Sequence, residues 1–234
     1  MPARPDSRSL SRAARVLLAL AALGGALLAL AWLVPLPARL AEAPSVVVEW
    51  RDGGVAHVFV APDGRWRPEV RSEEIDPGYL AALLRLEDRR FHLHPGVDPA
   101  AVARAAATNL WRGRRVSGAS TLTMQLVRML EPRPRTLGSK VVEALRAVQL
   151  EVRLGKGRVL AAYLQFVPFG GPLEGVEAAS LSWFGHRATA LSPAEVALLL
   201  AVPQDPARRA PGPGREARLR AARDQVARRL AALG

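Results

Sequence analysis

The longest apolar stretch of the chain covers residues 16–34 and contains no charged residue. As a helix it would be about 28 Å long, close to the hydrocarbon thickness of a bilayer. Arginines precede it, which predicts a cytoplasmic N-terminus and an extracytoplasmic remainder. A cleaved signal peptide is the alternative, because small residues follow at Ala38, Ala41 and Ala43. Signal-peptide apolar regions usually span about 7–15 residues, so the longer run favours a retained single-span anchor.

After the anchor the pattern changes to short alternating segments and then to helical periodicity. Residues 45–50 and 55–60 read as two strands joined by the turn at Asp52-Gly53-Gly54. Beyond Pro77 the chain is almost wholly helical, with helix starts at Asp76-Pro77 and Asp98-Pro99 and a capping box at Ser192–Glu195. The predicted helices cover residues 77–86, 98–111, 120–130, 136–154, a short helix around Tyr163 and Gln165, 175–184, 192–202 and the tail after Pro213, whereas residues 169–172 are predicted to be a loop.

These patterns predict a mainly α-helical fold with a small N-terminal β hairpin and a transmembrane helix. We expect a cytoplasmic basic tail (1–15), a transmembrane anchor (16–34), a small β appendage (45–70), a main domain (73–210) and a basic C-terminal helix (211–234). At 234 residues the chain has room for one good-sized core plus such an appendage.

The net charge of the chain limits the kinds of molecule that it is expected to bind. The formal net charge is +12, carried almost entirely by arginine, with lysine only at positions 140 and 156. This surplus favours nucleic acid, an anionic membrane surface or a phosphorylated substrate, and the predicted anchor makes nucleic acid the weakest of the three. The chain has no cysteine, which excludes disulfides and thiolate metal sites.

The first candidate for chemistry is the pair Glu87 and Asp88, which follows an apolar helical run just before Pro95-Gly96 interrupts regular structure. A partly desolvated carboxylate at such a place is a usable proton acceptor or donor. The alternative is a solvated, salt-bridged helix end. His92 and His94 with Asp98 could also form a metal site, although His-x-His on a loop is common.

Two further features could belong to the same site. The small residues 117–121 leave backbone N–H groups open at a helix N-terminus, a fitting place for phosphate oxygens, although such caps are routine. Lys140 and Glu143 lie one turn apart on one helix face and by default form a surface pair. Together, a carboxylate base, an anion cradle and a second carboxylate beside a lysine suit displacement of a phosphate leaving group.

The residues also carry a family resemblance. The run from Glu87 through Phe91, His94 and Gly96 to Asp98 resembles the first signature of the family 51 glycosyltransferases. These are the peptidoglycan polymerase domains of class A penicillin-binding proteins, here most like the 1C type, and of monofunctional transglycosylases. The later signatures follow in the family's order at residues 118–128, 140–143, 156–164 and 175–185.

The resemblance implies a lysozyme-like glycosyltransferase domain that polymerises lipid II with inversion and releases undecaprenyl pyrophosphate. It implies that Glu87 is the general base, and that Glu143 organises the pyrophosphate end with Lys140 and an optional divalent cation, Mg²⁺ or Mn²⁺. The implied substrate-binding residues are Asp88, Phe91, His94, Ser120, Thr121, Gln125, Arg128 and Lys140. It also implies a bacterial cytoplasmic membrane location with the catalytic domain outside, and partners that comprise lipid II, the glycan strand and a separate transpeptidase or other division or elongation proteins, but no nucleic acid.

Several positions depart from the family pattern. Ala119 replaces a glycine, Ser139 an arginine, Gln165 an asparagine, His186 a lysine and Arg128 a lysine. Losing cations near the pyrophosphate would lower activity, so one alternative is a weakly active or inactive protein that binds lipid II as a scaffold. Another is a glycan-cleaving enzyme on a lysozyme-like fold. Neither a Ser-x-x-Lys nor a Lys-Thr-Gly sequence occurs, so we expect no transpeptidase domain here.

Overall fold

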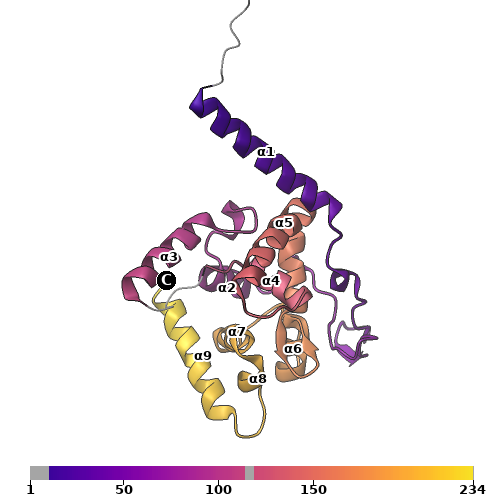
Figure 1. The fold of residues 1–234 in the computed structure, drawn as a ribbon. Coiled ribbons are helices and arrows are strands. Elements are labelled where there is room, and N and C mark those ends of the chain that lie inside the picture. Colours follow the sequence, from indigo (N-terminus) through magenta and orange to yellow (C-terminus); the bar gives the residue numbers. More distant parts are fainter. Residues whose placement is uncertain (1–10, 114–118, 234) are drawn as a thin grey trace, which may run out of the picture.

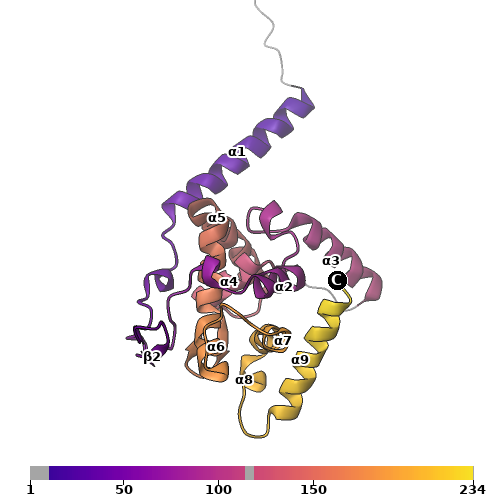
Figure 2. The ribbon, with the colours of Figure 1, turned by 180° about the vertical axis from the view of Figure 1, so that it is seen from behind.

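The computed structural model describes residues 11–113 and 119–233. A long helix, α1 (Arg12–Leu33), projects from a mostly helical body (Figures 1 and 2). Within α1, residues Ala14–Leu33 are long and apolar enough to cross a membrane, and only 8% of the best apolar window is buried by the rest of the protein. This confirms the predicted apolar helix by length and composition. Residues 1–10 of the predicted basic tail lie outside the described residues.

The predicted hairpin is present. Strands β1 (Val47–Glu49) and β2 (Val55–Val58) pair antiparallel with Val48 opposite His57. A parallel bridge between Ser45 and Pro68 ties the hairpin to the chain that leads into the main body.

The body is built from helices that begin and end close to the predicted positions. Asp76, Asp98, Thr121 and Ser192 each accept a backbone N–H through the side chain at a helix start, as their sequence context indicates. The helices are α2 (Pro77–Glu87), α3 (Pro99–Arg112), α4 (Leu122–Leu130), α5 (Leu137–Phe166), α6 (Val176–Phe184), α7 (Pro193–Ala201), α8 (Pro206–Arg209) and α9 (Glu216–Ala231). Short 3₁₀ helices lie at Ala38–Ala41, Ser72–Glu74, Phe91–Leu93 and Val202–Gln204.

The core runs from the place where α4 packs along α5 to the place where α7 packs against α9 (Figure 1). Leu122, Leu126 and Val127 on α4 are fully buried, because they lie on the apolar side of an amphipathic helix whose polar side carries Gln125 and Arg128. Ala222 and Val226 extend the same core into α9. The α4–α5 pair is therefore the rigid support on which nearby polar side chains are mounted.

One local prediction is confirmed and another differs from the structure. Gly155 was predicted to separate two helices, and α5 has a kink there, because Gly155 is non-helical (φ 73°, ψ 169°) between two helical parts. Residues 169–172 were predicted to be a loop, whereas β3 (Pro168–Gly170) and β4 (Leu173–Glu174) form a small antiparallel hairpin. The backbone of Trp66 supports that hairpin from outside. Its backbone N–H donates to the Pro172 carbonyl, and its backbone carbonyl accepts from the N–H of Glu174. A tertiary partner of this kind is invisible in the local pattern.

The anchor helix docks on α5 through its C-terminal end. Gln149 donates to the carbonyl of Ala31 (3.2 Å), Arg146 to that of Pro35 (2.8 Å) and Arg153 to that of Val34 (3.2 Å). The last carbonyls of a helix have no partner within the helix, so these side chains act as its cap. The direction of α1 is therefore set by α5.

Candidate functional site

A cavity of about 630 Å³ opens where the end of α2, the start of α3 and the loop before α4 meet. Each wall lies at a helix terminus, where backbone groups have no partner within the helix. The polar residues at the cavity are Glu87, Asp88, Arg89, Arg90, Asp98, Arg104, Ser120 and Thr121.

Glu87, the last residue of α2, is half-buried at the cavity wall. Gln125 on α4 donates its amide to the Glu87 carboxylate at 3.0 Å, and the Tyr163 hydroxyl lies 3.5 Å from the Gln125 amide oxygen. Burial, reinforced by the charge of Glu87, raises the pKa of both Tyr79 and Tyr163, so these phenols keep their protons. Glu87 is thus oriented on one oxygen, while the carboxylate stays at the cavity and available to a substrate proton.

Asp88 is adjacent in sequence but has a different environment. Its side chain is buried and accepts from His94 Nε2 (2.9 Å) and from the backbone N–H of Leu122 (3.0 Å). His94 Nδ1 accepts from Gly96 N, an arrangement that assigns the proton to Nε2. Asp88 therefore ties the end of α2 to the start of α4 and is engaged on both oxygens.

The loop after His94 is locked against the core by close backbone contact. Gly96 has φ +96°, and a Cβ there would lie 2.5 Å from the Ala147 carbonyl oxygen, so a side chain is excluded. The Thr121 hydroxyl donates to the Gly96 carbonyl at 2.6 Å and caps α4 by accepting from Met124 N. Residues 117 and 118 of the predicted anion cradle lie outside the described residues, and Ala119, Ser120 and Thr121 line the cavity.

Glu143 is only 4% exposed, which corrects the default expectation of a solvated surface pair with Lys140. Arg128 binds the Glu143 carboxylate through two nitrogens at 2.9 and 2.8 Å, and Lys140 Nζ lies 3.3 Å from it. Lys140 also donates to the Ser120 hydroxyl at the cavity wall. The hydrogen bonds of Arg128, together with both positive charges, hold the pKa of Glu143 below its usual value. Glu143 therefore holds two cations beside the cavity.

The remaining predicted substrate residues lie deeper. Phe91 is 1% exposed and His94 is 6% exposed, and Lys156 Nζ sits 4.3 Å above the Phe91 ring. Their place is behind Glu87 and Asp88 and not at the mouth of the cavity, because Phe91 belongs to the hydrophobic core.

The geometry does not favour the alternative of a metal site formed by His92, His94 and Asp98. Asp98 is paired with Arg90 and caps α3, while His94 is bonded to Asp88. Residues 11–113 and 119–233 contain no group of three His, Asp or Glu side chains that could hold a metal ion. Both oxygens of Glu143 already accept from cationic side chains, so the residues present do not fit the divalent cation predicted at that position. That cation stays a prediction.

Sequence reasoning placed Arg89 and Arg90 beside Glu87 but did not single out Arg104, which also lines the cavity. Arg104 follows Asp98 by six residues on α3, and nothing in the helical pattern alone shows that this face meets the end of α2. The available signal was the arginine surplus itself.

Comparison with known proteins shows the family of this chain. The sequence matches the transglycosylase family profile over residues 53–231. Penicillin-binding protein 1C of Escherichia coli K12 is 46% identical over 200 residues, which cover 86% of this chain and 26% of that protein. Penicillin-binding protein 1A of Aquifex aeolicus is 35% identical over 187 residues (76% and 26%), and a biosynthetic peptidoglycan transglycosylase of Salmonella arizonae is 34% identical over 195 residues (83% and 78%).

The chain spans about a quarter of the length of these two penicillin-binding proteins and over three quarters of the Salmonella transglycosylase. The mainly helical body agrees with the lysozyme-like fold that the sequence motifs implied. The resemblance read from those motifs is confirmed, and the chain belongs to the transglycosylase family.

Proposed function

We propose that this chain is a membrane-anchored peptidoglycan glycosyltransferase that polymerises lipid II. The observation that carries the proposal is one cavity with two chemically different walls. One wall presents the carboxylate of Glu87, and the other presents Ser120, to which Lys140 of the Lys140–Glu143–Arg128 cluster is bonded. A base on one side and cations on the other are what transfer from a pyrophosphate leaving group requires.

In the proposed reaction the 4-hydroxyl of the acceptor sugar attacks the anomeric carbon of the growing strand. Glu87 takes the hydroxyl proton, because a sugar hydroxyl is a poor nucleophile until that proton has an acceptor. The new carbon–oxygen bond forms on the face of the anomeric carbon opposite the pyrophosphate. The bond between that carbon and the pyrophosphate oxygen breaks, and undecaprenyl pyrophosphate leaves with its electron pair. Single displacement from the opposite face inverts the anomeric centre.

The cations would stabilise the charge that develops on the leaving group. Because Glu143 binds both Arg128 and Lys140 in the free protein, these side chains need little reorganisation when the pyrophosphate arrives. Arg104 adds positive charge at the same cavity. Mg²⁺ or Mn²⁺ dependence, predicted from the family, is tested by adding either ion after chelation, and no step above depends on it.

The proposed location follows from α1. We infer that α1 spans the bacterial cytoplasmic membrane with its N-terminus inside, so that the helical body meets lipid II at the outer surface. The net charge of +12 suits a polyanionic lipid and an anionic membrane.

The experiment is polymerisation of lipid II by the full chain in detergent, with glycan strands resolved by gel electrophoresis. We expect Glu87→Gln to lower the rate at least about 100-fold, because the amide keeps the shape but cannot accept the proton. Glu73→Gln is the matched control, since Glu73 is an exposed carboxylate on a different element. Equal rates for Glu87→Gln and the wild type would rule out this base.

A second candidate is a lipid II-binding scaffold with little activity. The observation in its favour is that His186, which replaces a lysine of the family pattern, pairs with Glu195 at 3.1 Å and does not line the cavity. Tight lipid II binding without polymer under any metal condition would favour the scaffold.

A further inference from the structure

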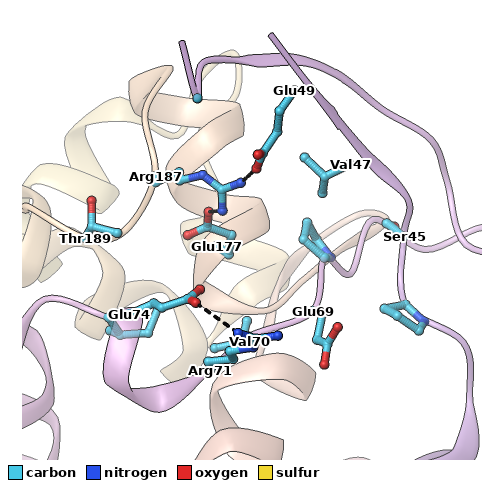
Figure 3. Close-up of a pocket in the computed structure, with 14 residues that line it drawn as sticks. Ser45, Val47, Glu49, Glu69, Val70, Arg71, Glu74, Glu177, Arg187 and Thr189 are labelled. Carbon is cyan, nitrogen blue, oxygen red and sulfur yellow. Dashed lines mark hydrogen bonds and ion pairs between the residues drawn. The ribbon is translucent and has the colours of Figure 1, made fainter. Parts of the chain in front are cut away.

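A second cavity, of about 640 Å³, lies beside the β1–β2 hairpin, on elements that take no part in the proposed reaction (Figure 3). It opens between β1, the segment 68–75, the start of α6 and the loop that follows α6. Ser45 and Val47 lie along one wall, and Glu69, Val70 and Arg71 lie along the facing one.

The outer edge of β1 is open along this cavity. Phe59 N donates to Val46 O and Trp50 N donates to Gly54 O, so the even-numbered residues of β1 direct their backbone groups to β2. The odd-numbered residues therefore face the other edge, where Ser45 N donates to Arg67 O at 2.8 Å. Beyond that bond, among the described residues, no backbone hydrogen bond joins Val47 or Glu49 to the segment 68–75.

The hairpin also carries an uncovered apolar surface. Trp50 is 66% exposed, Phe59 is 53% exposed and Val46 is 63% exposed. Open strand edges with apolar flanks are templates for a further strand, and proteins usually protect them when they have no partner. In both ribbon views the hairpin lies at the level of α6 and away from the end of α1, where the outer membrane surface would be (Figures 1 and 2), which favours a protein over the bilayer as the occupant.

The cavity has the opposite charge to the molecule as a whole. Four carboxylates and two guanidinium groups line it, in a chain whose net charge is +12. Arg187 is held between Glu177 (3.0 Å) and Glu49. Glu69 has no ion pair among the described residues, and Arg71 lies 3.7 Å from an exposed Glu74. Burial, with the nearby charge of Glu74, raises the pKa of Glu177. Four carboxylates against two guanidinium groups leave a surplus of negative charge, which an incoming cation would relieve.

From this geometry we propose that the outer edge of β1 is a docking site for an extended segment of a partner protein, which pairs with Val47 and Glu49 and places a lysine or arginine in the acidic cavity. Main-chain hydrogen bonds at the edge would supply affinity, and the cavity would supply the preference for a basic side chain. The site is independent of lipid II chemistry.

The test uses fluorescein-labelled nine-residue peptides of alternating valine and threonine with Lys, Arg, Gln or Glu at the centre. Binding to the full chain in phosphatidylcholine nanodiscs is followed by fluorescence anisotropy. We expect the Lys and Arg peptides to bind about tenfold more tightly than the Glu peptide. That preference should disappear in the double variant Glu69→Gln/Glu74→Gln, which changes only exposed side chains.

Val47→Pro is the second variant. Proline at this position removes an N–H that faces away from β2, so the hairpin itself keeps its hydrogen bonds, while an added strand loses a donor. Peptide binding should fall at least about tenfold, whereas Val47→Ala, which keeps the N–H, should bind as the wild type does. Polymerisation of lipid II should be the same in all three variants.

Three outcomes would overturn the proposal. The first is equal binding of the Lys and Glu peptides, or no binding of any peptide up to about 1 mM. The second is unchanged binding to Val47→Pro. The third is a wild-type dimer that Val47→Pro converts to a monomer in sedimentation, because the edge would then be occupied by a second copy of this chain.

Discussion

Glu143 shows how a single residue determines the charge at the proposed leaving-group side. Its carboxylate is buried and is held by two hydrogen bonds from Arg128, with Lys140 as a further cation. An acidic residue beside two basic ones lowers the net positive charge of the site, yet it fixes where that charge lies. We interpret Glu143 as a positioning residue for the two cations.

The depressed pKa of Glu143 makes a prediction for stability. Its folded pKa lies below the ordinary value of 4.5, so its contribution is fully present above the unfolded-state pKa and is lost as pH falls through the folded-state pKa. Glu143→Gln should therefore lower the free energy of unfolding by about 2 kcal/mol near neutral pH. The difference from wild type should shrink as the pH falls below 4.5.

Urea unfolding of the detergent-solubilised protein, followed by circular dichroism at about pH 7 and pH 3, measures this difference. Glu216→Gln changes an exposed carboxylate on α9 and should have no effect at either pH. A deficit for Glu143→Gln that is as large at the lower pH as at the higher one would contradict the proposed ion cluster.

At the scale of elements, the site depends on how closely the loop after α2 approaches α5. Gly96 touches the backbone of α5, and its carbonyl accepts the hydroxyl of Thr121, which starts α4. The close approach at Gly96 thus fixes the positions of the loop after Glu87, the start of α4 and α5 relative to one another.

Gly96→Ala should be strongly destabilising, because the new methyl group would collide with the Ala147 carbonyl and the backbone would be strained at φ +96°. Gly185→Ala is the matched control, since Gly185 also has positive φ (76°) but nothing within 4 Å of the added Cβ. We expect the Gly96 variant to lose about 2 kcal/mol more than the control in urea unfolding. Equal losses would show that the loop can move away from α5 at little cost.

At the scale of the whole molecule, the anchor and the body form one connected structure. Gln149, Arg146 and Arg153 cap the end of α1, and Arg39, just beyond it, donates to the Met129 carbonyl (2.8 Å) and pairs with Glu174 (3.0 Å). Removal of the chain up to Pro35 would leave Gln149, Arg146 and Arg153 without these acceptors.

We therefore predict that the anchor is retained. Mass spectrometry of the protein extracted from membranes should give a chain that includes α1. A mature chain that begins near Ala41 would contradict this prediction and would identify the apolar segment as a signal peptide. Detection of the same membrane-extracted species with an N-terminal tag provides an independent control.

Much of the fold can be predicted from residues that are close together in the sequence. The apolar run of residues 16–34, the turn at Asp52-Gly53-Gly54 and the helix caps at Asp76, Asp98 and Ser192 each depend on residues close in sequence. The β3–β4 hairpin was missed because its support comes from Trp66, about one hundred residues upstream.

The sequence alone specified which residue types were available: two adjacent carboxylates at a helix end, a lysine and a glutamate one turn apart, an apolar span and a large arginine surplus. The tertiary structure alone decided their environments. Glu87 stays at a cavity with one oriented oxygen, Asp88 is buried by His94 and Leu122, and Glu143 is enclosed by cations from two helices. The physical reason is that desolvation and hydrogen bonding depend on partners distant in the chain, and only packing brings those partners together.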